Sequence, residues 1–204
     1  MAQQVNDIKA YVTAMRADPR CNGKIGVVGG SSGASHAVTV ALDTTDSGVG
    51  VWPYWNAAAR PDCAVMLSCI YDFSDWTPPT DHAATDPDFV LFGLENYAQT
   101  RVLNTLATLP LNPVTLVASA KAAGWRPLYM INSYGDHPTA YHQIVTMSCT
   151  LAANGLVLDT DYQRLTIPGT QHSFHYWNSW DHVHSDHSIT VGRDVVAFLD
   201  AHPK

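Results

Sequence analysis

Basic residues are scarce in this chain. Its 204 residues include 11 Lys and Arg against 18 Asp and Glu, which gives a formal net charge of −7. Proteins that bind nucleic acid or an anionic membrane surface do so through basic patches. The composition therefore argues against both kinds of partner and favours a small or neutral ligand.

Long hydrophobic runs are missing as well. The sequence has no stretch of eighteen apolar residues, which excludes a membrane-spanning helix on length. The N-terminus "MAQQVNDIKAYV" lacks the basic start and apolar core of a signal peptide. We therefore expect a cytoplasmic protein, unless a leader has been removed from the sequence.

Cysteine is rare and shows no pairing pattern. None of the four cysteines stands in a CxxC pair, and their density is far below that of a disulfide scaffold. We expect buried free thiols at Cys21, Cys63, Cys69 and Cys149. With 46% hydrophobic and 14% charged residues, the chain has the composition of one globular domain over residues 1–204.

Hydrophobic periodicity predicts strands that alternate with helices. The apolar run at 24–29 is continuous, as is typical of a strand covered on both faces of a parallel sheet. Further strands are expected at 61–70, 126–133 and 162–169. Helical spacing marks 5–15, 32–42, 113–123, 139–154 and 188–202. This alternation predicts an α/β domain with three layers (α/β/α) and a mainly parallel sheet.

The stretch "KIGVVGGSSGASHA" joins the first predicted strand to a helix. Gly29, Ser31 and Gly33 form the pattern G-x-S-x-G, the nucleophile elbow, in which small neighbours allow a tight turn that exposes the serine. The stretch has neither the lysine of a P-loop nor the spacing of a dinucleotide-binding loop. Since the motif alone also fits an ordinary turn, a base and an acid must be found for the serine.

Two later strand ends supply those partners. Asp136 follows the third predicted strand in "NSYGDHPTAYHQ", and His172 follows the fourth in "IPGTQHSFHYW". The order Ser, Asp, His is the one expected on this scaffold. The carboxyl ends of parallel strands meet at one edge, so the three side chains can converge there.

At these positions the chain resembles the α/β-hydrolase family, especially its carboxylesterase and lipase-like members. The resemblance rests on three segments: "DIKAYVTAMRADPRCNGKIGVVGGSSGASHA", "RPLYMINSYGDHPTAYHQIVTMSCTLAANGL" and "LTIPGTQHSFHYW". It implies a serine hydrolase that cleaves carboxylic esters through an acyl-enzyme, with no cofactor. Ser31 would be the nucleophile, His172 the base and Asp136 the acid. The backbone amide of Ser32 would stabilise the oxyanion.

Some alternatives stay open at this level. Ser32 is a second candidate nucleophile, because Gly30 and Ala34 give it small neighbours too, and His175 is a second candidate base. The histidine-rich tail "HSFHYWNSWDHVHSDHS" could ligate zinc, although it lacks an HExxH or cysteine framework, so we expect a solvated loop and no metal.

The region rich in Pro, Asp and aromatic residues at about 71–111 is expected to be a lid-like excursion between strands. Aromatic residues there and just before it could line a substrate pocket or simply pack the interior: Trp52, Tyr54, Trp55, Tyr71, Phe73 and Trp76.

Family members usually have several strands before the elbow strand, and an early loop, often of His-Gly-Gly type, that carries the second oxyanion donor. Only about two dozen residues precede this strand here, which implies a shortened α/β-hydrolase fold. We therefore expect the edge of strand 24–29 to be covered by a second copy of the chain, in a homodimer, or by a complementing N-terminal chain. A catalytically weak or inactive fragment, or a binding module, is the alternative to an active esterase.

Overall fold

Four parallel strands form the central sheet of the computed structural model, which describes residues 2–44, 59–74, 111–136, 138–177 and 185–202. In order across the sheet they are β1 (Gly26–Gly30), β2 (Cys63–Leu67), β3 (Leu128–Ser133) and β4 (Tyr162–Ile167). Each strand pairs in parallel with the next one along the chain. The predicted strand segments are confirmed, and all four carboxyl ends lie at one edge of the sheet.

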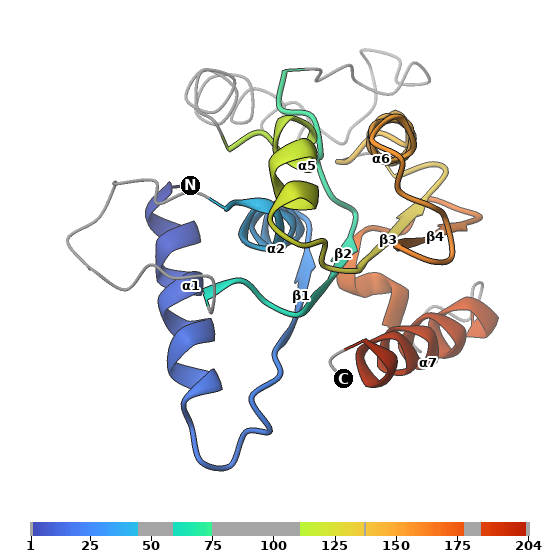
Figure 1. The fold of residues 1–204 in the computed structure, drawn as a ribbon. Helices are drawn as coiled ribbons and strands as arrows, with labels where there is room; N and C mark the ends of the chain where they lie inside the picture. The colour runs from blue at the N-terminus through green and yellow to red at the C-terminus, as the bar shows by residue number, and fades with distance from the viewer. Residues whose placement is uncertain (1, 45–58, 75–110, 137, 178–184, 203–204) are drawn as a thin grey trace.

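Helices cover both faces of the sheet (Figure 1). One face carries α2 (Ser32–Leu42), α5 (Pro113–Ala122) and α6 (His142–Ala153). The other carries α7 (Ser185–Ala201), which packs beside the short 3-10 helix η3 (Ser173–Trp177). The architecture is therefore the expected α/β/α arrangement of three layers.

Alternation along the strands divides the core in two. Ala64 and Met66 of β2 point toward α2, α5 and α6. Val65 and Leu67 point toward α7. All residues of β2 and β3 are buried, which explains why β2 and the first four residues of β3 are apolar without interruption.

The first strand differs from this pattern. The sequence predicts it to be covered on both faces, yet Val27 and Val28 are only half-buried and Gly26 is exposed. The reason is position: among the described residues β1 pairs only with β2 and forms one edge of the sheet. An apolar strand at an edge is a site where further pairing is favourable.

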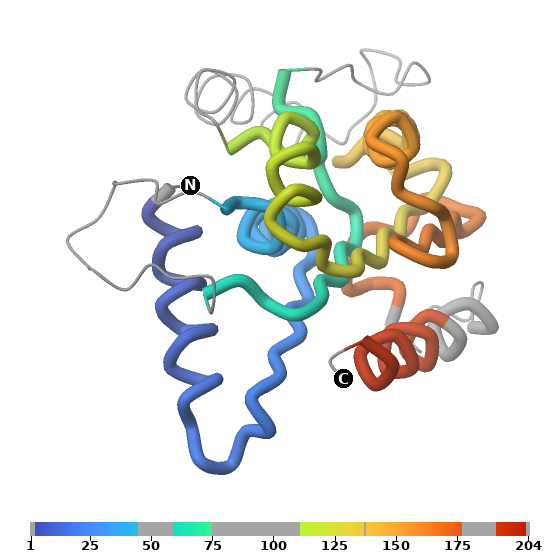
Figure 2. Tube along the Cα trace, viewed as in Figure 1, coloured from blue at the N-terminus to red at the C-terminus, as the bar shows by residue number. Residues whose placement is uncertain are grey.

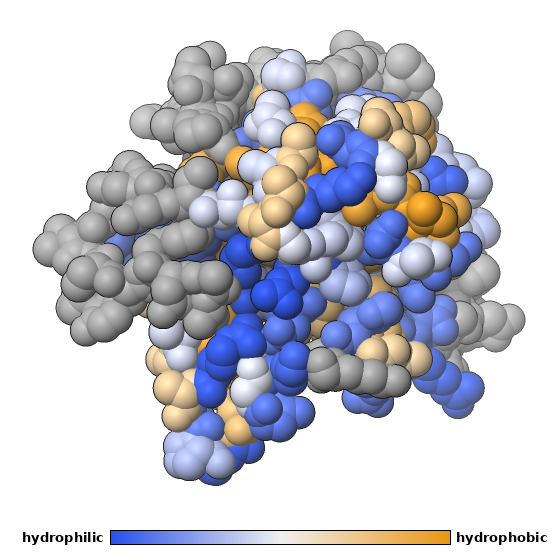
Figure 3. All heavy atoms as spheres, viewed as in Figure 1, coloured by the Kyte–Doolittle hydropathy of each residue, from blue (hydrophilic) through white to orange (hydrophobic). Residues whose placement is uncertain are grey.

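Helix α1 (Ala2–Arg16) lies beside this edge, at the blue start of the tube in Figure 2. Its buried Lys9 forms an ion pair with the buried Asp43, at the end of α2. Arg16 donates to the Asp62 carboxylate over 2.7 Å, and the same carboxylate accepts from the Ile25 amide over 2.9 Å. The lower end of α1 and the loop after it show both hydrophilic (blue) and pale orange residues on the face seen in Figure 3. These bonds fix the start of β1, and so the position of the serine turn at its other end.

Most of the predicted excursion at 71–111 lies outside the described residues, as do Trp52, Tyr54, Trp55 and Trp76. Tyr71 and Phe73 are described, and both are buried in the interior. Among the described residues, every helix is too short or too polar to cross a membrane.

The four cysteines are free thiols, as expected, but they are not all buried. Cys63 and Cys69 are buried, Cys21 is partly accessible and Cys149 is exposed. Cys149 lies on the outward face of the amphipathic helix α6, a placement that cysteine spacing cannot reveal.

Candidate active site

The turn after β1 has an unusual backbone conformation at Ser31. Its φ of 56° and ψ of −123° lie in a region that side-chain-bearing residues rarely occupy, at a cost of ~1–3 kcal/mol. The Ser31 amide still donates to the Leu67 carbonyl over 2.9 Å, and its own carbonyl accepts from Ala34 over 2.9 Å. The last bond of the sheet and the first turn of α2 therefore meet at this one residue, and together they hold the strained conformation.

The glycines around Ser31 have different roles. A Cβ on Gly29 would lie 2.1 Å from the Gly33 carbonyl oxygen, so the backbones on the two sides of the turn are in direct contact there. A Cβ on Gly30 would lie 2.0 Å from the Ser173 Oγ and 2.7 Å from the Phe174 ring. A Cβ on Gly33 would meet nothing within 4 Å. Of the two glycines in the G-x-S-x-G pattern, only the first is required by space.

Asp136 and His172 are in direct contact. The His172 Nδ1 and the Asp136 Oδ1 are 2.8 Å apart, with the Asp136 side chain fully buried and the His172 side chain 22% exposed. Because an ionised carboxylate only accepts hydrogen bonds, the proton of this bond belongs to Nδ1. The Nε2 of the neutral imidazole is then left as an acceptor.

The loops that carry these two residues are joined to each other. Ser133 Oγ donates to the Gln171 carbonyl over 2.6 Å, and the Gly135 amide donates to the Gly169 carbonyl over 2.8 Å. A Cβ on Gly135 would lie 3.0 Å from Thr170 and 3.1 Å from the Gly169 oxygen, so only glycine fits without displacement. The acid loop and the histidine loop therefore form one packed unit.

This unit reaches the serine turn through its neighbours. Ser173 and Phe174, which follow His172, lie against Gly30, which precedes Ser31. The structure thus brings Asp136 and His172 into contact and places the histidine loop against the turn that carries Ser31. The described contacts connect Ser31 to the pair through these adjacent residues rather than through a hydrogen bond of its own.

Ser32 is the exposed first residue of α2. Amides in the first turn of a helix have no acceptor within the helix and carry the positive end of its dipole. The Ser32 carbonyl is within hydrogen-bond distance of a side chain, since His36 Nδ1 lies 2.6 Å from it. Burial lowers the pKa of His36 below its usual value near 6.5, and the bond to Ser32 partly opposes that change.

An apolar groove of about 590 Å³ runs beside the serine turn, between the β1 edge, α1 and η3. Its lining includes Ile8, Val28, Gly30, Gly33 and Phe174. The groove therefore lies against the glycines on both sides of Ser31 in the chain and could receive an apolar group of a ligand.

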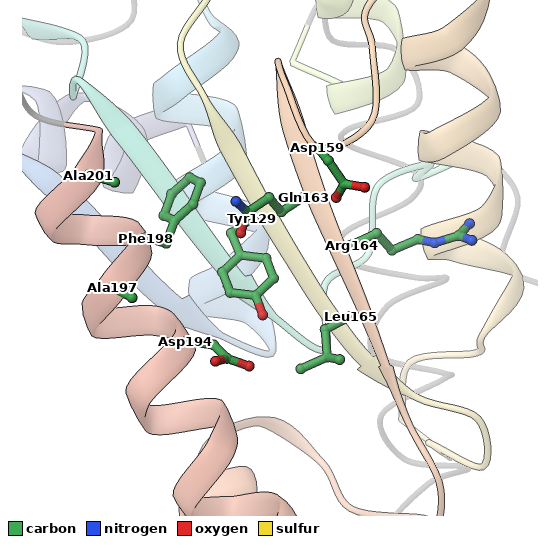
Figure 4. Close-up of a pocket in the computed structure, with 9 residues that line it drawn as sticks. All are labelled: Tyr129, Asp159, Gln163, Arg164, Leu165, Asp194, Ala197, Phe198 and Ala201. Atoms are coloured by element: carbon green, nitrogen blue, oxygen red, sulfur yellow. The ribbon is translucent and has the colours of Figure 1, made fainter.

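A second cavity, of about 400 Å³, lies between β4 and α7 (Figure 4). Asp194 and the Tyr129 hydroxyl face it, and burial, with a smaller effect from Asp194, raises the pKa of Tyr129. Arg164 points away from α7, and its guanidinium donates to Ser148 of α6 over 3.4 Å. The nine lining residues include no serine, cysteine or histidine, so the chemistry expected at the serine turn has no counterpart here.

The other histidines considered as the catalytic base or as metal ligands are less well placed than His172. His175 is exposed, and its described bond is a backbone bond to the carbonyl of His172. The remaining histidines of the tail, His182, His184 and His187, have no described side chains. In the described part of the chain, no group of three or more His, Cys, Asp or Glu side chains is arranged to hold a metal ion.

Two residues at the carboxyl ends of the strands were not identified from the sequence. Ser68 follows β2 with a positive φ of 55°, and the fully buried Tyr176 lies one helical turn after His172. The only signal for Ser68 was a serine directly after a strand, and Tyr176 read as one more aromatic residue of the tail.

The fold is that of the α/β-hydrolases. The backbone matches esterase B from Lactobacillus rhamnosis with a TM-score of 0.62 and 19% identity, over 98% of this chain and 61% of the esterase. An esterase from Thermogutta terrifontis with bound butyrate matches with a TM-score of 0.62 and 15% identity, over 96% of this chain and 65% of the other. The acetyl ester-xyloside bifunctional hydrolase from Caldicellulosiruptor lactoaceticus matches with a TM-score of 0.60 and 16% identity, over 95% and 65%.

This chain thus spans about three fifths of the length of the solved structures that it resembles. No protein-family model matches the sequence, and no curated protein matches it significantly.

Proposed function

We propose that this chain is a serine hydrolase that cleaves carboxylic esters through an acyl-enzyme, with Ser31, His172 and Asp136 as its catalytic triad. The observation that carries the proposal is the 2.8 Å contact between a buried carboxylate and a partly exposed imidazole. The loop that carries the imidazole packs against a strained serine turn. The turn then serves as a nucleophile elbow.

The chemistry follows from the proton positions. His172 Nε2 accepts the Ser31 hydroxyl proton as Oγ attacks the acyl carbon, and the imidazolium that forms is stabilised by Asp136. Collapse of the tetrahedral intermediate transfers that proton to the leaving alcohol and leaves an acyl group on Ser31. A water then repeats the sequence, which releases the acid and restores the serine.

The Ser32 amide is the proposed oxyanion donor, because an N–H at the start of α2 has no acceptor within the helix and carries the positive end of its dipole, which suits the carbonyl oxygen of the substrate. Such oxyanions are usually held by more than one donor. We propose that a strand paired to the edge of β1, from a second copy of this chain or from a complementing chain, brings the other donor. Loss of one donor typically costs about 10² to 10³ in rate, so a lone chain should be a slow catalyst.

The test uses a fluorophosphonate probe and short p-nitrophenyl esters on wild type, Ser31→Ala and Ser32→Ala. We expect Ser31→Ala to abolish labelling and turnover. Ser32→Ala keeps its backbone amide, so it should retain both. Loss of labelling in Ser32→Ala alone would move the nucleophile to Ser32. A folded wild-type protein that neither reacts nor turns over would support the alternative, an inactive module that keeps the hydrolase fold.

A further inference from the structure

A pair of buried hydroxyl groups lies beneath the contact between Asp136 and His172. Ser68 Oγ and Tyr176 Oη are 2.7 Å apart, and both side chains are fully buried. Tyr176 Oη is also 3.4 Å from the Asp136 Oδ2 and accepts from the Ser133 amide over 3.0 Å. The Ser173 amide donates to Ser68 Oγ over 2.8 Å. One tyrosine thus connects the ends of β2 and β3 to the acid loop.

The hydrogen positions in this chain of bonds can be assigned from the acceptors. Asp136 as a carboxylate only accepts, so the single hydroxyl proton of Tyr176 goes to Oδ2. Ser68 must then donate to Tyr176, and its oxygen accepts from Ser173. Every bond runs in the same direction, from Ser173 through Ser68 and Tyr176 to Asp136. Each polar group in it has a partner, and bonds aligned in this way strengthen one another.

The other oxygen of the Asp136 carboxylate also accepts hydrogen bonds. Asp136 Oδ1 accepts from the Thr139 amide over 3.0 Å and from His172. The Thr139 hydroxyl donates in turn to the Ser68 carbonyl over 3.2 Å. Ser68 therefore supports the acid loop from both its side chain and its backbone.

The backbone of Ser68 indicates that this arrangement has a cost. Its φ of 55° lies in the left-handed region that favours glycine, yet a serine occupies it. The hydroxyl that a glycine would lack is the group that bonds to Tyr176 and to the amide following His172.

We propose that Tyr176 and Ser68 are positioning residues for the catalytic pair, because their hydroxyl relay fixes the Asp136 carboxylate and joins the histidine loop to the end of β2. This inference rests on the proposed function for its kinetic consequence. Its structural consequence, a carboxylate held in place against His172 Nδ1, does not depend on turnover. Burial, reinforced by Asp136, raises the pKa of Tyr176, so its hydroxyl stays protonated as a donor throughout the working range of pH.

The test compares Tyr176→Phe, which removes only the hydroxyl, with Tyr11→Phe, which does the same at an exposed site on α1. We expect Tyr176→Phe to lower kcat roughly 10-fold to 100-fold, the range set by leaving buried polar groups unpaired, with little change in KM. Tyr11→Phe should leave both unchanged. A purely structural role would lower thermal stability without moving kcat of the folded fraction.

A second readout separates this proposal from the proposed function. In a proton NMR spectrum the His172 Nδ1 proton, bonded to a carboxylate, should give a downfield signal. It should be present in wild type and Tyr11→Phe but broadened or lost in Tyr176→Phe. If wild type shows the signal but does not react with fluorophosphonate, the proposed function fails while the relay can still be tested. If Tyr176→Phe keeps the signal at full sharpness, the relay is refuted whatever the activity.

Where Tyr176→Phe does not fold, Ser68→Gly tests the proposal instead, because glycine suits the positive φ and removes the hydroxyl together with its Cβ. The same loss of signal and of kcat is expected. An unchanged signal and kcat in Ser68→Gly would overturn the proposal.

Discussion

Gly29→Ala should destroy the serine turn, whereas Gly33→Ala should leave it intact. The two glycines are the outer members of the same G-x-S-x-G pattern, and each replacement adds one methyl group. An added Cβ on Gly29 would lie 2.1 Å from the Gly33 oxygen, 2.4 Å from the Gly33 carbonyl carbon and 2.7 Å from the Ala34 nitrogen. All three are backbone atoms, so no side-chain rotation can relieve the overlap.

The magnitude follows from that geometry. Ordinary contact between a Cβ and these atoms begins above 3.4 Å, so the first turn of α2 would have to move by more than an ångström. Overpacking of this kind costs about 1–3 kcal/mol, and more where the backbone must shift. Gly33 has open space and no positive φ, so alanine there should be neutral or stabilise α2 by up to about 1 kcal/mol.

Urea unfolding gives the free energy of unfolding of each variant, and fluorophosphonate labelling reports the state of Ser31. Gly29→Ala should lose about 2 kcal/mol or more, in the upper part of that range because the backbone must shift, and should label poorly even where it is folded. Gly33→Ala should unfold at the same urea concentration as wild type, or a higher one, and label normally. Equal stability of the two variants would refute the steric argument. The unfolding result does not require the chain to be an active esterase.

Three further outcomes are expected. In native protein at pH 8, a thiol reagent should modify the exposed Cys149 quickly and reach Cys63 and Cys69 only on unfolding. Burial raises the pKa of Cys63 to about 11 and also raises the pKa of Cys69. Fast modification of either buried thiol would contradict this packing. Because burial lowers the pKa of His36 in the fold while the unfolded chain takes up a proton near pH 6.5, the stability that is fully present above that pH decreases as the pH falls below it. Between pH 7.5 and 5.5 the melting temperature of His36→Gln should therefore fall less than that of wild type. An equal fall in both proteins would contradict a contribution of His36 to this pH dependence. If a strand added to β1 brings an oxyanion donor, the specific activity should drop on dilution to nanomolar concentrations. A protein that light scattering shows to be a monomer, and whose specific activity stays constant on dilution, would contradict that proposal.

The strands and helices could be predicted because their sequences are simple. β2 is apolar at every position and β3 at its first four, since both faces of these strands are covered, and the helices between the strands show regular spacing. The half-buried state of β1 could not be predicted in the same way. Its apolar run looks like those of β2 and β3, and only the strand order shows that it lies at an edge.

The same limit applies within the candidate site. Ser31, Asp136 and His172 stand at strand ends in motifs that the sequence displays, so they could be named without a structure. Tyr176 has no motif, because its role depends on a hydroxyl 2.7 Å from a serine 108 positions earlier in the chain. Contacts of that separation are created by the parallel crossovers themselves, which bring the ends of β2, β3 and β4 together. A sequence can therefore identify the groups that would react, while the groups that hold them in place emerge only when the sheet is assembled.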